Sequence, residues 1–340
     1  MESHILSNAV VGALLLGALA SAWAVRRSRM WSEAFGEIWQ RRRLALCVVF
    51  LYLGVALLDS IAWVGGGDVG QDAVARHQAQ SVIDRLFADF EERSYSAPFA
   101  ATEFYGGAPL RHPGSHVLGT DLIGRDVLYL SLKGARVALL IGGLTSLLAI
   151  PLALLFGVPA GYFGGRLDDV VFFVMSTLAS MPGLLLLIAL IMVLGKSTLA
   201  VCFALAVTGW VGFCRVSRGE TLKLRELEYV SAARSLGVSE SRILLRHILP
   251  NLMHLVIITF VLMFSGLVLS EAILSWLGIG VDGSWGQMID QARNELSRDP
   301  VVWWNVSAAG AALFGLILAV NFVGDALRDT LDPRTVRESE

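Results

Sequence analysis

The sequence from Val137 to Gly161 reads VALLIGGLTSLLAIPLALLFGVPAG and contains no charged side chain. A helix needs roughly 20 apolar residues to cross the hydrocarbon core of a membrane, and this run is long enough. Prolines and glycines interrupt it, but membrane helices tolerate them because neighbouring helices satisfy the freed backbone groups. The stretch therefore predicts a membrane-spanning helix and sets the fold class of the chain.

The composition of the whole chain agrees with this interpretation. Hydrophobic residues make up 55% of the sequence, charged residues make up 16%, and the mean hydropathy is +0.64. A soluble domain would carry roughly a quarter charged residues. We expect an all-α polytopic membrane protein, because apolar runs long enough to span lie between the charged segments. The predicted spans are 7–25, 44–64, 137–161, 169–194, 198–216, 253–275 and 303–325.

Basic residues predict the orientation, because cytoplasmic loops are enriched in Lys and Arg. Arginines follow the first predicted span over 26–43, and further basic residues lie in 217–252 and in the C-terminal tail. No Lys or Arg precedes the first span, which is the opposite of the charge order in a secretory signal. We therefore expect a true first span, an extracytoplasmic N-terminus and a cytoplasmic C-terminus.

The most informative cytoplasmic segment is 218–251, RGETLKLRELEYVSAARSLGVSESRILLRHILPN. We expect a helix over 222–236, a turn at Gly237, and a second helix over 239–250 with Ser239 as its N-cap. Small residues near the turn would let another protein approach closely, and the alternative is an ordinary solvated loop. The face expected to be exposed near the turn carries Glu228, Ala232, Ala233 and Leu236.

This segment resembles the EAA loop of permeases in binding-protein-dependent ABC importers, in which a short helix docks into a cleft of the ATPase. The resemblance rests on Ala232-Ala233, on Gly237 and on the ending HILPN at 247–251. Ser231 departs from the family pattern, which has a glutamate there, and Glu228 lies one turn earlier. The implied ATPase-coupling residues are Glu228, Ser231, Ala232, Ala233, Leu236, Gly237, Arg242, His247 and Pro250.

A second string, LGTDLIGRDVL at 118–128, is similar to a motif of the C-type subunit in dipeptide, oligopeptide and nickel permeases. The resemblance covers about residues 35–333 and implies a six-span type I permease core with one extra N-terminal span. Further matching strings follow in family order: GYFGG at 161–165 with Asp168, SEA at 270–272, SWLG at 275–278, SWGQM at 284–288, and GDALRD at 324–329 with Asp332-Pro333.

The implied domains follow from the same comparison. They are an extra span over 1–30, a lead-in and first core span over 31–65, an extracytoplasmic segment over 66–136, a permease core over 137–330 and a tail over 331–340. The extracytoplasmic segment should contain an amphipathic helix that serves as a packed external cap rather than a substrate contact. Its apolar face is predicted from Val74, Val82, Ile83, Leu86, Phe87 and Phe90.

The same motif at 118–128 is expected to form an external gate or scoop before the third span. We expect Thr120 and Asp121 to cap a helix at the external surface, and Arg125 to pair with Asp126. The full set implied by the resemblance is Gly119, Thr120, Asp121, Gly124, Arg125 and Asp126.

Glu271 is an ionisable residue at membrane depth, which makes it a candidate for translocation. Its place near the external end of its span favours a structural role, with hydrogen bonds to the neighbouring external hairpin. Trp276 and Gly278 are further structural or translocation candidates. No metal site is predicted, because Pro113 and Gly114 break any helix that would align the histidines on either side of them.

The resemblance implies a transport subunit and not an enzyme. Peptides would arrive on an extracytoplasmic binding protein and pass through the cytoplasmic membrane, between this chain and a homologous second permease subunit. ATP and Mg²⁺ would bind two separate ATPase subunits, because Gly195-Lys196-Ser197 lacks the earlier glycine of a phosphate loop. No cofactor, metal or nucleic acid is expected on this chain, and its other partner is membrane lipid.

Two groups of alternatives remain at this point. The same machinery could carry nickel chelates, siderophores or peptide-conjugated antibiotics, since related permeases serve them all. A membrane enzyme or a channel is the remote alternative. An enzyme should show titratable groups clustered within the spans, and a channel should show a filter or a ring of charges. Neither pattern is visible in the sequence.

Overall fold

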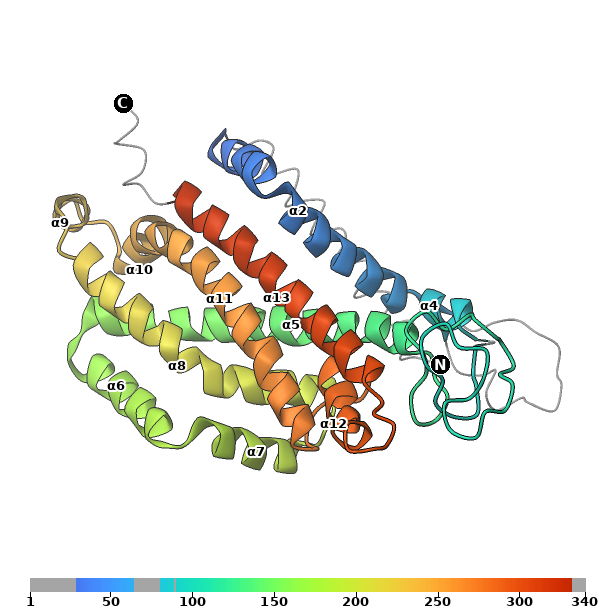
Figure 1. Ribbon diagram of the computed structural model, residues 1–340. Coiled ribbons are helices and arrows are strands. Elements are labelled where there is room, and N and C mark those ends of the chain that lie inside the picture. Colours follow the sequence, from blue (N-terminus) through green and yellow to red (C-terminus); the bar gives the residue numbers. More distant parts are fainter. Residues whose placement is uncertain (1–28, 64–79, 89, 332–340) are drawn as a thin grey trace. The chain divides into compact units, whose positions relative to one another are not determined.

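The computed structural model describes residues 29–63, 80–88 and 90–331, and it is mostly helical (Figure 1). In this part of the chain, five helices are long and apolar enough to cross a membrane, and a bent helix pair would make a sixth. These helices lie where six of the predicted spans were expected, which confirms the all-α polytopic fold. The predicted span at 7–25 lies outside the described residues.

Most spans extend further than the apolar runs alone predict, because the helices continue into their polar flanks. Helix α2 (Arg29–Ser60) is interrupted at Arg42, which has φ −134° and ψ 36°, and the apolar part that follows ends at Ser60. The other unbroken spans are α5 (Val127–Phe163), α8 (Thr198–Leu224), α11 (Leu249–Trp276) and α13 (Trp304–Leu331).

The span predicted over 169–194 is two helices instead of one. Helix α6 (Gly165–Ser180) and helix α7 (Gly183–Leu194) meet at a bend of 92°. Met181 is extended there, with ψ 138°, because the ring of Pro182 disfavours helical backbone at the preceding residue. The proline that the sequence placed inside a span therefore divides it.

The described residues fall into two compact units, of which the first comprises residues up to 139 together with 271–326. It contains α2, the strand pair β1 (Ala62–Trp63) and β2 (Gln80–Ser81), and α4 (Val82–Leu86). The two strands are antiparallel, with Ala62 opposite Ser81. The unit also contains the start of α5, the end of α11, helix α12 (Trp285–Glu295) and most of α13.

The predicted amphipathic helix is much shorter than expected. Ser81 starts α4 with a capping box, because its hydroxyl accepts from the Asp84 amide while Asp84 accepts from the Ser81 amide. The helix ends at Leu86, since Phe87 leaves helical geometry as the C-cap. Ile83 is buried as predicted, Phe90 lies beyond the helix, and Val74 lies outside the described residues.

Helix α12 was not predicted, although the sequence holds a signal for it. Ser284 is its N-cap and accepts a hydrogen bond from the Gln287 amide at 3.1 Å, which fits a Ser-x-x-Gln start. The helix buries Trp285 against α5, where the indole Nε1 donates to the Ser131 carbonyl at 2.8 Å. A side chain at Gly134 would approach this ring to 2.3 Å, so only glycine fits there.

The second unit comprises residues 140–270 and the described residues that follow 326. It contains the rest of α5, helices α6 to α8, and α9 (Glu228–Ser235). The chain then continues through α10 (Glu240–Ile243), the π-helical turn η1 (Leu244–Ile248) and α11. Its core is apolar and includes Ala149, Ala153, Met175, Trp210 and Cys214.

Glycines in α5 let α8 approach closely within this unit. A Cβ at Gly157 would lie 2.7 Å from the Cys214 carbonyl oxygen, and one at Gly161 would lie 2.5 Å from that of Arg218. Gly161, within the motif GYFGG, therefore serves the packing of these two helices. Gly164 and its neighbour Gly165 form the turn after α5, with φ of 67° and 57°.

Candidate functional site

Within the segment 218–251, residues 225–248 form a series of short helices that we call the elbow. Helix α8 ends at Leu224, and a turn over 225–227 precedes α9, so the helix predicted over 222–236 is wrong in its continuity. The second predicted helix is wrong at its end, because the chain runs through η1 into the span α11 and does not stop at Pro250. Single π-turns inside helices are frequent at functional sites.

Gly237 makes the turn between the two arms of the elbow, as predicted. Its φ is 77°, which a residue with a side chain rarely adopts. Ser239 occupies the N-cap position of α10, but its hydroxyl makes no capping hydrogen bond. The start of α10 is instead held by the Ser239 carbonyl, which accepts from the amides of Arg242 and Ile243 at 2.9 and 3.0 Å.

The inner face of the elbow is apolar and buried. Ala233 was expected on the exposed face, but it is 8% exposed, and with Val230 it faces inward one helical turn apart. The reason is the break at 225–227, which sets the rotation of α9 separately from that of α8. The buried cluster consists of Val158, Tyr162, Val230, Ala233, Ile243, Ile248 and Leu252.

The outer face carries most of the predicted coupling residues. Leu236 is 84% exposed at the turn, so its apolar side chain remains in water and gains no free energy of burial. His247 is half-buried. The other predicted residues on the exposed side are Glu228, Ser231, Ala232, Gly237, Arg242 and Pro250.

A polar cluster that the sequence did not reveal joins the elbow to the end of α5. Tyr162 donates its hydroxyl proton to Glu240 Oε2, and Arg234 Nη2 donates to the same hydroxyl at 3.1 Å. Arg234 also lies against the Tyr162 ring at 5.4 Å and is 3.8 Å from Glu240. No spacing in the sequence relates Tyr162 to residues over 70 positions later in the chain.

Two arginines make further contacts with the end of α5 and the start of α6. Arg225 Nη1 donates to the Gly161 carbonyl at 3.0 Å, which satisfies a backbone acceptor at the C-terminal end of α5. Arg218 forms a two-pronged ion pair with Asp168, in which Nη2 lies 2.6 Å from Oδ2. These contacts hold the 161–168 corner against the beginning of the elbow.

In the first unit, the motif at 118–128 folds around a tight turn. Asp121 accepts from the amides of Ile123 and Arg125 at 3.0 and 2.9 Å. Its other oxygen accepts from Arg125 Nε at 2.9 Å, so the predicted pair of Arg125 with Asp126 is wrong. Asp121 takes the role because the turn folds its carboxylate back over the following amides. Gly119 and Gly124 have φ of 74° and 81°, which the turn requires.

Asp126, and not Thr120 or Asp121, caps α5. Its Oδ1 accepts from the amides of Leu128 and Tyr129 at 2.7 and 3.1 Å. Thr120 lies too early to cap the helix and is hydrogen-bonded at 2.7 Å to the Ser96 amide. The cap therefore lies five residues after Asp121 and six after Thr120, which corrects the predicted capping residues.

His116 is buried beside this cap. Its Nδ1 lies 2.8 Å from Asp126 Oδ2, and its Nε2 lies 3.6 Å from Glu92 Oε1. The hydrogen bond to Asp126 raises the pKa of His116 even though burial opposes it. Burial acts to raise the pKa of Glu92, but hydrogen bonds from the amides of Arg111 and His112 outweigh it and hold that pKa low. Among the described residues, no group of His, Cys, Asp and Glu suits a metal ion.

Glu295, at the end of α12, is a second buried acid in this unit. It is 1% exposed and accepts hydrogen bonds from the Tyr95 hydroxyl at 3.2 Å and from Asn305 Nδ2 at 3.3 Å. Burial raises the pKa of Glu295, and the negative charge of Asp121 acts in the same direction. Burial and the neighbouring Glu295 raise the pKa of Tyr95 to about 12.

Glu271 is held by hydroxyl groups at the junction of α11 and α12. It is 3% exposed, and Ser275 Oγ donates to its Oε1 at 2.5 Å. The same hydroxyl lies 3.1 Å from Ser284, the N-cap of α12. Trp276 is 45% exposed, and Gly278 turns the chain after α11 with φ 75°.

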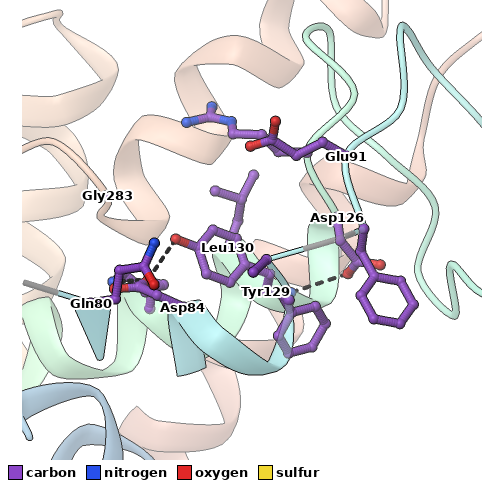
Figure 2. A pocket seen from close by; sticks show the side chains of 12 residues that line it. Gln80, Asp84, Glu91, Asp126, Tyr129, Leu130 and Gly283 are labelled. Carbon is purple, nitrogen blue, oxygen red and sulfur yellow. Dashed lines mark hydrogen bonds and ion pairs between the residues drawn. The ribbon is translucent and has the colours of Figure 1, made fainter. Parts of the chain in front are cut away.

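A pocket of about 530 Å³ opens in the first unit between α4, the start of α5 and the motif turn (Figure 2). Its charged groups are largely paired with one another. Lys133 Nζ lies 2.7 Å from Asp84 Oδ1 and 3.0 Å from Asp59 Oδ1, and the Tyr129 hydroxyl donates to Asp84 at 2.8 Å. Burial acts to raise the pKa of Asp84, but these bonds lower it to about 2.

Comparison with known proteins identifies one family, and its match includes the elbow and the spans from the later part of α5 onward. Residues 153–337 match the family described as "Binding-protein-dependent transport system inner membrane component". The oligopeptide transport system permease protein OppC of Bacillus subtilis is 35% identical over 222 residues, which cover 64% of this chain and 72% of OppC. The glutathione transport system permease protein GsiD of Pectobacterium atrosepticum is 34% identical over 245 residues, covering 71% and 80%.

One group of solved structures is also similar to this chain. Inward-facing conformations of the MetNI methionine ABC transporter are 18% identical, with a TM-score of 0.49. The similarity covers 60% of this chain and 97% of the other.

Proposed function

We propose that this chain, which belongs to the family of binding-protein-dependent transport system inner membrane components, moves di- and oligopeptides across the membrane as one permease subunit of an ABC importer. Several similar proteins are named as permeases for oligopeptides, dipeptides or glutathione, and this supports a peptide as the cargo. The cargo would come from an extracytoplasmic binding protein, on which the family depends.

The observation that carries the proposal is the elbow, which offers an exposed apolar turn on a buried base. Leu236, the C-cap of α9, is 84% exposed, while Val230 within α9 is fully buried. Such a surface favours a protein partner, because the base holds its shape and the apolar side chain gains free energy when covered. We assign this face to the ATPase subunit, with Glu228, Ser231 and Ala232 beside Leu236.

The mechanism follows from the continuity of the helices. ATP and Mg²⁺ would bind two ATPase subunits, and closure of these subunits would displace α9 as a rigid body. The elbow would transmit this displacement into α11, because α10, η1 and α11 follow one another without a loop. A homologous second permease subunit would complete the path. The basic residues of 217–252 support a cytoplasmic elbow and C-terminus, and hence an extracytoplasmic N-terminus.

The function is tested by reconstituting the full transporter in liposomes with ATP enclosed and the binding protein outside. A labelled oligopeptide should accumulate only when the binding protein and ATP are both present. Uptake that is unchanged without the binding protein would contradict the proposal. Transport of a nickel chelate or a siderophore, with no peptide uptake, would keep the machinery and overturn the cargo.

Docking is tested separately by chemical crosslinking. Ala232→Cys, in a chain whose native cysteines are replaced, should crosslink to the ATPase through a short bifunctional reagent. Leu86→Cys is the matched control, because Leu86 is 64% exposed but lies on α4, in the other unit. Equal crosslinking at both positions, or none at Ala232, would refute the docking face.

A further inference from the structure

We infer that Tyr162, Arg234 and Glu240 are positioning residues that brace the elbow and carry its movement to the end of α5. The inference rests on the proposed function, since it assumes that an ATPase displaces α9. It concerns a contact beneath the docking face and not the docking face itself. The end of α5, α9 and α10 all belong to the second unit.

The three residues form one connected contact. The hydroxyl of Tyr162 donates to Glu240 and accepts from Arg234, so it uses its donor and one acceptor site. The Tyr162 side chain is itself buried, at 5% exposure, among Val230 of α9 and Ile243 of α10. A single residue of α5 therefore contacts both arms of the elbow.

The turn between the arms explains why such a brace matters. Gly237 has φ 77°, and an added Cβ there would meet no atom within 4 Å. An open glycine turn deforms easily, because glycine populates a wide range of backbone angles. A push on α9 would be weakened in this turn unless contacts outside it joined the arms, as the buried cluster around Tyr162 and its polar contacts do. Arg234 and Glu240 lie on either side of the turn, and both reach the same hydroxyl.

The exposure of the charged groups separates transmission from stability. The side chains of Arg234 and Glu240 are 51% and 47% exposed, so their ion pair at 3.8 Å is screened by water and adds little to the folding free energy. The apolar packing of the Tyr162 ring does not depend on the hydroxyl. Removing the hydroxyl should therefore loosen the connection between the arms and α5 while the fold persists.

The test uses Tyr162→Phe in the complete reconstituted transporter, with peptide transported per ATP hydrolysed as the measurement. We expect the ratio to fall by about fivefold, the order expected when an ordinary hydrogen bond is lost, because water screens the half-exposed charged partners. The ATPase subunits should still co-purify, because the variant leaves the outer face unchanged. Glu240→Ala, which removes the acceptor, should give a similar loss, and the double variant should be no worse than either single one.

The matched control is Glu220→Gln, which removes an exposed ion pair with Lys223 at 2.9 Å near the end of α8. Its ratio should equal that of the wild type. An unchanged ratio in Tyr162→Phe, or an equal fall in Glu220→Gln, would overturn the inference. So would a fall that a lower melting temperature of the variant fully explains. If the wild-type chain does not co-purify with an ATPase, the proposed function itself fails, which is a different result.

Discussion

Replacing Leu236 with serine is expected to weaken ATPase binding without destabilising this chain. Full burial of a leucine side chain is worth roughly 1.5–3 kcal/mol relative to exposure. Leu236 is 84% exposed in the isolated chain, so most of that free energy is still available to a partner. If docking covers the side chain, its loss should cost about 1.3–2.5 kcal/mol, or roughly 8-fold to 70-fold in Kd.

The assay is a titration of the purified ATPase subunit against the permease subunits in nanodiscs, with thermal melting of the permease measured in parallel. Leu86→Ser is the control, since it removes a leucine that is 64% exposed outside the elbow. A Kd for Leu236→Ser within about twofold of the wild type would refute the reasoning, because losing a leucine that the partner covers should change the binding free energy by more than that. A marked fall in melting temperature would show that Leu236 packs within the chain.

Three further predictions concern the stability of the first unit, each read from its melting temperature. Gly124→Ala should destabilise it by at least about 2 kcal/mol, because the new Cβ would lie 2.0 Å from a backbone oxygen, whereas Gly107→Ala, at φ 68° in open space, should cost less. The raised pKa of His116 means that its ion pair with Asp126 stabilises the fold below about pH 6.5, and that this stabilisation is lost as the pH rises through the folded-state pKa. His116→Gln should therefore melt at a lower temperature than wild type at pH 6. Its melting temperature should also fall less than that of wild type between pH 6 and pH 9. An equal pH dependence in both proteins would contradict this. The raised pKa of Glu295 gives the same direction with pH, because the folded state loses stability as the pH rises from about 4.5 toward the folded-state pKa. Glu295→Gln removes this ionisation and should therefore melt higher than wild type at pH 8, and a lower melting temperature there would count against the assignment.

One predicted feature of the elbow, its turn, was confirmed because it depends on a single residue. Gly237 could be placed at a turn because glycine tolerates a positive φ, and the structure has it at 77°. The position of Ala233 failed because the exposed face of a helix depends on where the helix starts. The break at 225–227 gave α9 a start of its own, and Ala233 turned inward.

The motif at 118–128 shows the same limit at closer range. Its composition indicated capping and ion pairing, and both occur, but between other residues. Asp121 folds back onto Arg125, while Asp126 caps α5. Asp121 and Asp126 carry the same side chain five residues apart, and only the path of the turn decides which one meets which partner.

The amino-acid sequence by itself determined where the apolar segments long enough to cross a membrane lie within the described residues, because the length of an apolar run is a local property. It also determined the family, because the matching strings keep their order along the chain. Only the tertiary structure decided what lies beneath the exposed turn at Leu236. Tyr162 meets Arg234 and Glu240 there because α5 and the elbow pack together, and contacts between residues so far apart in sequence arise from packing and not from local pattern.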